Sequence, residues 1–85
     1  MKNKNYVICG RMYVIDTDAC NFGTSVLVVE AQKSQDQEAQ MRILQSVVLR
    51  AIGLEAMLMV PAGDFSVVLA EIIKILLEGN HAASN

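Results

Sequence analysis

The chain has 85 residues, which suffices for one small domain but not for two independent hydrophobic cores. Its formal net charge is −2 and its basic residues are dispersed, which disfavours nucleic-acid binding, because such binding normally needs a basic stripe. Hydrophobic residues make up 53% of this acidic chain and charged residues only 19%, so we expect excess apolar surface that self-association would cover.

Membrane insertion and secretion are both disfavoured by the sequence. No run reaches the roughly 18 uncharged apolar residues that a membrane-spanning helix needs. A basic start followed by an apolar run would suit a signal peptide, but Gly10 and Arg11 interrupt that run. Cys9 and Cys20 are too few for a disulfide framework and are not spaced as CxxC, so we expect reduced thiols, although one bridge between them stays open. The sequence therefore predicts a cytoplasmic protein with no membrane segment.

The first third of the chain has the composition of β-structure. A polar lead-in over residues 1–5 precedes residues 6–15 (YVICGRMYVI), whose β-branched and aromatic side chains predict a strand that is bent or bulged at Gly10. Residues 16–23 (DTDACNFG) form a turn cluster, and residues 25–32 (SVLVVEAQ) predict a second strand. Two consecutive strands joined by a short loop predict an antiparallel hairpin.

A helix is predicted next, followed by a short apolar segment. Ser34 and Gln37 have the spacing of a capping box, and Gly53 is suited to end the helix near residue 52. Residues 54–60 (LEAMLMV) are an apolar run bounded by Gly53 and Pro61, which predicts a third, buried strand. The Ala, Met and Leu content of this run would suit a helix equally well.

The last predicted helix, residues 65–78, is apolar almost all the way round. Its charged residues are Glu71, Lys74 and Glu78. At about 100° per residue these fall within an arc of about 60°, much narrower than the polar face of an ordinary surface helix. Such a helix must be covered on two sides, which predicts a homo-oligomer, with a dimer favoured.

The boundaries of this helix complete the predicted fold. Asp64 is suited to cap its start and Gly79 to end it, and residues 80–85 are expected to form a flexible tail. Residues 6–79 then form a single α+β domain. The expected order is β-β-α-β-α, in which an antiparallel hairpin and a third strand form a sheet with two helices packed on it.

The predicted subunit interface lies on the final helix. One side of that helix and its opposite side are both apolar, and the pattern does not decide which of them faces the chain's own sheet. The candidate interface residues are Val68, Ile72, Ile75 and Leu76 on one side and Leu69, Ile73 and Leu77 on the other.

The sequence offers little catalytic or metal-binding chemistry. Residues 16–21 (DTDACN) hold two carboxylates, but the fifth position is Cys20 and the sixth is Asn21 where a calcium loop needs Gly, so a turn is expected instead. His81 is the single histidine and lies in the predicted tail, which excludes a histidine-based zinc site. No nucleophile elbow, phosphate loop or dinucleotide motif is present. We therefore expect no metal and no cofactor, and an enzyme is disfavoured.

Two functional hypotheses remain from the sequence. The first is a small cytoplasmic protein-interaction module, acting as an accessory, adaptor or inhibitor and forming a homodimer through the final helix, with another protein as a further partner. The alternative is a small-molecule-binding or modestly catalytic domain, with its pocket between sheet and helices or at the dimer seam. The candidate ligand-binding residues for that alternative are Tyr6, Arg11, Tyr13 and Asp64.

Overall fold

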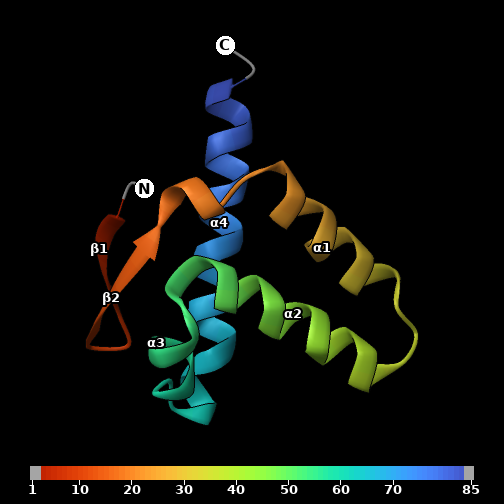
Figure 1. The fold of residues 1–85 in the computed structure, drawn as a ribbon, viewed down its shortest axis with the longest axis horizontal. Helices are drawn as coiled ribbons and strands as arrows, with labels where there is room; N and C mark the ends of the chain where they lie inside the picture. Colours follow the sequence, from red (N-terminus) through yellow and green to blue (C-terminus); the bar gives the residue numbers. More distant parts are fainter. Residues whose placement is uncertain (1–2, 84–85) are drawn as a thin grey trace.

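An N-terminal β-hairpin followed by helices makes up the fold, so the chain belongs to the α+β class (Figure 1). The computed structural model describes the backbone of residues 3–83 and the side chains of residues 3–78. The strands are β1 (Asn3–Ile8) and β2 (Arg11–Asp16), and the helices are α1 (Phe22–Lys33), α2 (Gln37–Ile52), α3 (Leu54–Leu58) and α4 (Phe65–Ala83). Two short 3-10 helices, η1 (Thr17–Ala19) and η2 (Ala62–Asp64), precede α1 and α4.

The hairpin forms within residues 3–16, where the sequence predicted one bent strand. Cys9 and Gly10 both have positive φ, 54° and 77°, as the two central residues of a type I′ turn require. This turn reverses the chain, and β1 and β2 pair antiparallel with Tyr6 opposite Tyr13 and Ile8 opposite Arg11. The predicted pairing of residues 6–15 with residues 25–32 is therefore wrong.

Residues 25–32 belong to helix α1 and not to a strand, which corrects the prediction. The side-chain Oδ1 of Asn21 accepts a hydrogen bond from the backbone N–H of Thr24 at 3.2 Å and caps the helix. Thr24, Val28 and Ala31 are buried at the i, i+4, i+7 spacing of a helix. The valines lower helix propensity only slightly, so capping and packing outweigh their preference for strands.

Helix α2 confirms the prediction made for it, with one change at its start. Gly53 ends the helix with φ 87° and donates its backbone N–H to the carbonyl of Leu49 at 2.9 Å. The N-cap is Asp36, whose carboxylate accepts from the N–H of Glu38 at 3.1 Å. Ser34, the predicted cap, instead ends α1.

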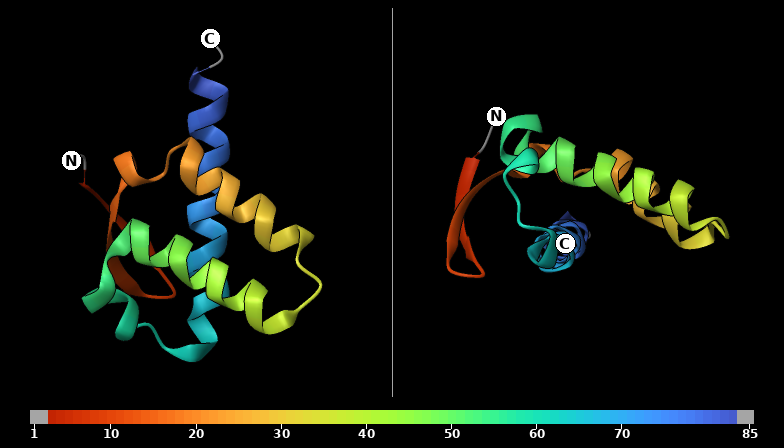
Figure 2. Two further views of the ribbon diagram at one scale, coloured as in Figure 1. Left: turned by 45° about the vertical axis from the view of Figure 1, so that its right-hand side comes forward. Right: turned by 90° about the horizontal axis from the view of Figure 1, so that it is seen from below.

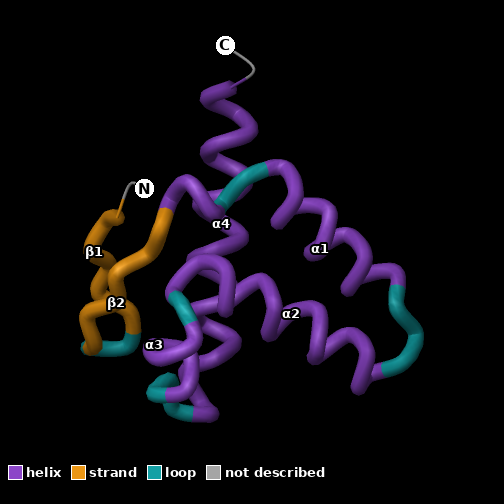
Figure 3. The backbone as a smooth tube through the Cα atoms, in the orientation of Figure 1, coloured by secondary structure: helices purple, strands orange, loops and turns teal. Residues whose placement is uncertain are grey.

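The predicted third strand is a helix. Residues 54–58 form α3, a single turn and a half directly after Gly53, so the β-β-α-β-α order is wrong and the sheet within the described residues has two strands (Figure 3). Leu, Glu, Ala and Met are all good helix formers, and this local preference prevails over the apolar run that suggested a buried strand.

Helix α4 packs against both α1 and α2. The antiparallel pair α1–α2 crosses it on one side, and the hairpin lies beyond the C-terminal end of α2 (Figures 1 and 2). The view along α4 in Figure 2 shows α1 and α2 on one side of it and the hairpin on a second side, with the remaining side uncovered. The buried core draws on all of these elements, with Ile8, Tyr13 and Ile15 from the hairpin, Val28 from α1, Val47, Val48 and Ala51 from α2, and Val68, Ile72 and Leu76 from α4.

The ends of α4 differ from the prediction. The helix runs through Gly79 to Ala83, so the predicted stop at Gly79 is wrong. Asp64 lies in η2, immediately before the first residue of α4. Residues 84 and 85 of the predicted tail are outside the described residues. In the part of the chain that is described, no helix combines the length and apolar character needed to cross a membrane.

Candidate functional site

A groove between β2 and α3 brings together two residues nominated from the sequence. It has a volume of about 410 Å³ and is lined by Arg11, Met12, Tyr13, Val14, Ile52, Ala56 and Met59. Strand β2 supplies one wall, and the last residue of α2 together with α3 and the turn after it supplies the other. We refer to these seven residues as the β2–α3 groove.

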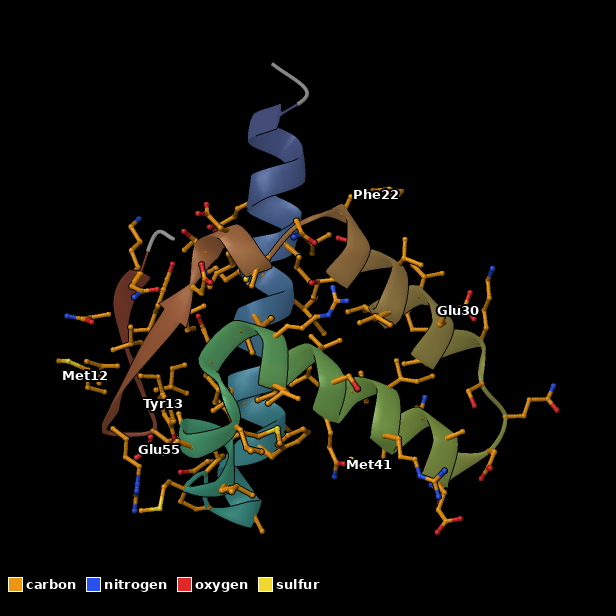
Figure 4. The ribbon with its side chains drawn as sticks, in the orientation of Figure 1. Met12, Tyr13, Phe22, Glu30, Met41 and Glu55 are labelled. Atoms are coloured by element: carbon orange, nitrogen blue, oxygen red, sulfur yellow. The ribbon has the colours of Figure 1, made fainter. Side chains whose placement is uncertain are left out.

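Tyr13 lines this groove and carries a buried polar atom without a partner. The side chain is only 7% exposed, and its hydroxyl is buried with no hydrogen-bond partner among the described residues. Figure 4 shows Tyr13 extending from β2 toward α3. A buried hydroxyl of this kind is destabilising, so it marks a position where a further group is needed to satisfy it.

Arg11 contributes a positive charge to the same groove. Arg11 and Tyr13 are two residues apart on β2, so their side chains project from the same face of the strand. Arg11 is exposed, and within the described residues its guanidinium forms neither an ion pair nor a hydrogen bond. Of these two donor groups, the Arg11 guanidinium is the exposed one, whereas the Tyr13 hydroxyl is buried.

The other two candidate ligand residues lie elsewhere. Tyr6 pairs with Tyr13 across the hairpin and packs against the core, but it does not line the groove. Asp64 is half-buried in η2, next to the hairpin turn, where its carboxylate faces Cys9. Partial desolvation, together with this neighbouring carboxylate, raises the pKa of the Cys9 thiol.

The pKa of the second cysteine is also raised. Burial raises the pKa of the half-buried Cys20, and the Asp16 carboxylate raises it further. Its Sγ donates to the carbonyl of Asp16 at 3.7 Å. Cys9 and Cys20 are both free, so neither is bridged to the other.

The predicted turn cluster stabilises the backbone over residues 16–21, whereas Phe22 and Gly23, which were predicted to belong to it, begin α1. The Asp16 carboxylate accepts from the N–H of Asp18 at 3.0 Å, and the Asn21 side chain donates to the Asp18 carbonyl at 3.1 Å. Thr24 adds a hydrogen bond from its hydroxyl to the carbonyl of Ala19 at 2.6 Å. Among the described residues no group of acidic, cysteine and histidine side chains could hold a metal ion, and the side chain of His81 lies outside them.

A second groove lies between α1 and α4. It has a volume of about 300 Å³ and is lined by Ser25, Val28, Val29, Gln32, Ile73, Leu76 and Leu77. The hydroxyl of Ser25 is buried there without a hydrogen-bond partner among the described residues. This is a mostly apolar seam between two helices, with one unsatisfied polar atom.

Large apolar side chains are exposed beside this second groove. Phe22, Val26 and Val29 follow one another along α1 at helical spacing and are 76%, 42% and 45% exposed. Leu77 of α4 is 65% exposed. We define the α1/α4 face as Phe22, Val26, Val29, Ile73 and Leu77.

The structure separates the two sides of α4 that the sequence left undecided. Val68, Ile72 and Leu76 are buried against the chain's own core, and Ile75 is partly buried with them. Leu69 and Ile73 are also partly buried, whereas Leu77 faces outward. A single chain therefore covers the side of α4 that carries Val68, Ile72 and Leu76, and the exposed large apolar side chains of this helix are Val67 and Leu77.

Comparison of the chain with protein-family models, with curated proteins and with solved structures finds no match.

Sequence reasoning missed the helical half of the β2–α3 groove and all of α1. Ala56 and Met59 are three residues apart, a spacing that brings side chains together on a helix but not on a strand. The available signals were the helix-forming composition of residues 54–58 and, for α1, the spacing of Asn21 and Thr24 as cap and capped residue.

Proposed function

We propose that this chain is a small protein-interaction module, an accessory, adaptor or inhibitor, that acts as a homodimer through the α1/α4 face. The observation that carries the proposal is the row of exposed apolar side chains on that face, above all Phe22 at 76% and Leu77 at 65% exposed. Contiguous apolar surface of this kind is typical of interaction sites on small proteins.

The apolar chemistry of the α1/α4 face supports a second copy of this chain as the partner that binds there. A two-fold dimer would place α1 of one protomer against α4 of the other, because the same patch serves both partners in such an interface. Phe22 would then be an aromatic anchor in the centre of the contact, where aromatic residues are enriched.

A reducing compartment such as the cytoplasm is part of this proposal. Cys9 and Cys20 are free thiols, and an oxidising compartment would favour their bridging to each other or to other chains. A further protein partner would bind the assembled dimer.

Solution mass over a hundredfold range of concentration, by light scattering after size exclusion, tests the dimer. We expect a mass close to twice 9.3 kDa. Leu77→Asp and Phe22→Asp should each weaken the dimer about thirtyfold or more, because each buries a charge where an anchor stood. Both variants should stay folded, since both side chains are exposed in the single chain.

Val7→Asp is the matched control for these variants. Val7 is 71% exposed, as much as the two interface residues, but it lies on β1 away from α1 and α4. It should leave the mass unchanged. A wild-type chain that is monomeric throughout the range, or a Leu77→Asp protein as dimeric as the control, would refute the proposal.

A further inference from the structure

The outer edge of β2 carries backbone groups that no strand pairs with. In an antiparallel ladder, hydrogen-bonded pairs of residues alternate with pairs whose N–H and C=O groups point away from each other. The pair that flanks the two-residue hairpin turn, Ile8 and Arg11, is of the hydrogen-bonded kind. Met12 and Val14 therefore direct their N–H and C=O groups away from β1, and these groups form no hydrogen bond within the described part of the chain.

A continuous channel runs along this edge of β2. The β2–α3 groove is lined by every residue from 11 to 14, and consecutive residues of a strand point to opposite faces, so this groove follows the edge of the strand. A second groove of about 280 Å³ shares Val14 and Ile52 with it and continues along β2 to Asp16. Its opposite wall is the end of α2, residues 50–53. We refer to the two grooves together as the β2 edge channel.

The length of the channel suits an extended segment of chain. Residues 12–16 of β2 span about 13 Å at about 3.3 Å per residue, which matches a partner segment of about five residues. A two-stranded hairpin is only marginally stable by itself, so a third strand would extend a minimal sheet. The other edge, on β1, carries the exposed Lys4, and a lysine on an edge strand disfavours pairing with another chain.

The side chains along β2 would select the residues of that segment. Met12 and Val14 are 65% and 48% exposed on one face of the strand, where β-branched or aromatic residues of an added strand would pack beside them. Arg11 projects from the other face, is exposed, and forms no ion pair or hydrogen bond with the described residues, so it favours an acidic neighbour.

The remaining charges near the channel leave the positive charge of Arg11 unopposed at its end. Asp16 and Arg50, which have opposite signs, both line the far end of the channel. Glu55 of α3 is exposed and does not line the channel, so water screens its charge.

We propose that the β2 edge channel binds an extended segment of another protein as a third, antiparallel strand, with apolar residues beside Met12 and Val14 and an acidic residue beside Arg11. Backbone hydrogen bonds along a sheet edge supply affinity in this mode of recognition, and alternate side chains supply specificity. The channel shares no residue with the α1/α4 face, so this partner binds separately from the proposed dimer contact.

The probe for the test is the octapeptide STVAVETS, acetylated and amidated at its ends. In the antiparallel register its two valines lie opposite Val14 and Met12, and its glutamate lies opposite Arg11. Titration into the isotopically labelled full chain should give saturable amide shifts that centre on β2 and on residues 50–59. Hydrogen exchange of the Met12 and Val14 amides should slow, because their N–H groups gain acceptors.

Three altered peptides test the backbone pairing and the charge. N-methylation of both valines removes the N–H groups that would donate to the carbonyls of Met12 and Val14, and should weaken binding about tenfold or more. N-methylation of the alanine, whose N–H points away from β2, is the matched control and should leave binding unchanged. Replacement of the glutamate by glutamine should weaken binding about threefold, and Arg11→Gln should abolish this difference between the two peptides.

A matched pair of proline variants tests the strand edge itself. Proline is tolerated on an edge strand where the missing N–H would point outward. Met12→Pro should weaken peptide binding about fivefold or more, because it removes one edge donor. Val7, which lies opposite Met12 and is 71% exposed, presents its N–H at the other edge of the hairpin, so Val7→Pro should leave binding unchanged.

Four results would each overturn the proposal. The first is the absence of saturable shifts in the folded chain, and the second is equal binding of the valine-methylated and alanine-methylated peptides. The third is a glutamine peptide that binds wild type as tightly as the glutamate peptide does. The fourth is a peptide-free chain whose Met12 and Val14 amides shift with protein concentration, because a second copy would then occupy the edge. The same titrations on the Leu77→Asp chain should give the same affinities, which keeps a failure here distinct from a failure of the dimer.

Discussion

Removal of the Tyr13 hydroxyl should stabilise the free protein, the opposite of what most substitutions in a core do. The ring is packed in the core with only 7% of the side chain exposed, and Tyr13→Phe keeps the ring. Only the hydroxyl is lost, and it is buried without a hydrogen-bond partner among the described residues. The variant therefore removes an unfavourable group and no favourable contact.

The size of the effect follows from the cost of an unsatisfied polar group. Burying a hydroxyl without a partner costs about 1–3 kcal/mol, so Tyr13→Phe should raise the free energy of unfolding by about that amount. For a domain of this length, each kcal/mol corresponds to about 4–8 °C in Tm. Urea unfolding followed by far-UV circular dichroism, at one fixed protein concentration, measures the change without interference from dimerisation.

Tyr6→Phe is the matched control for this measurement. Tyr6 lies opposite Tyr13 on the hairpin, but its hydroxyl is not among the buried unpaired atoms of the described side chains. Its removal should change the free energy of unfolding by no more than about 0.5 kcal/mol. A Tyr13→Phe chain that is equally stable or less stable than wild type would refute the reasoning, because it would mean that the hydroxyl is satisfied by water.

Three further substitutions or measurements test other parts of the fold. Ile72→Asp should cost about 3–5 kcal/mol and leave the chain largely unfolded by circular dichroism, because Ile72 is fully buried; a folded variant would contradict the core assignment. Cys9→Asn should raise the free energy of unfolding by up to about 1 kcal/mol, because Asn tolerates the positive φ of 54° better than Cys. The urea midpoint should rise accordingly, and a lower midpoint would contradict this. Alkylation of Cys20 by iodoacetamide should be slow at neutral pH, because the raised pKa of this thiol keeps the sulfur protonated, and its rate should rise only at a pH above the ordinary thiol pKa. Asp16→Asn should shift this rise in rate to lower pH, and an unshifted profile would contradict the role of the Asp16 carboxylate.

The sequence predicted the positions of α2 and α4 well, although the start of α2 and the end of α4 differ from the prediction. Helix α2 followed from its amphipathic spacing and from the stop at Gly53, and α4 followed from its long apolar run. The hairpin turn was missed because Cys9 occupies a position that usually holds Asn or Asp, so the local pattern indicated a bulge in place of a reversal. The β-branched residues of α1 then suggested a strand that would complete the hairpin. In the folded chain, the cap formed by Asn21 and Thr24 outweighs the strand preference of these residues.

The candidate site was predictable only in part, for the same reason. Arg11 and Tyr13 were nominated as polar groups of an apolar strand, and they line one groove. Ala56 and Met59 were not nominated, because their shared face exists only when residues 54–58 are helical. The position of Ile52 beside β2 depends on tertiary packing, which local sequence patterns do not predict.

The contribution of α4 to the core has a consequence for the order in which the chain folds. The hairpin β1–β2 and the helical pair α1–α2 each form from neighbours in sequence, and such local contacts form quickly. Neither unit has a closed core, because Val68, Ile72 and Leu76 complete it from residues far along the chain. Docking of α4 is therefore expected to be the committing step, after which hydrogen exchange in the hairpin and in α1–α2 slows together as one cooperative unit.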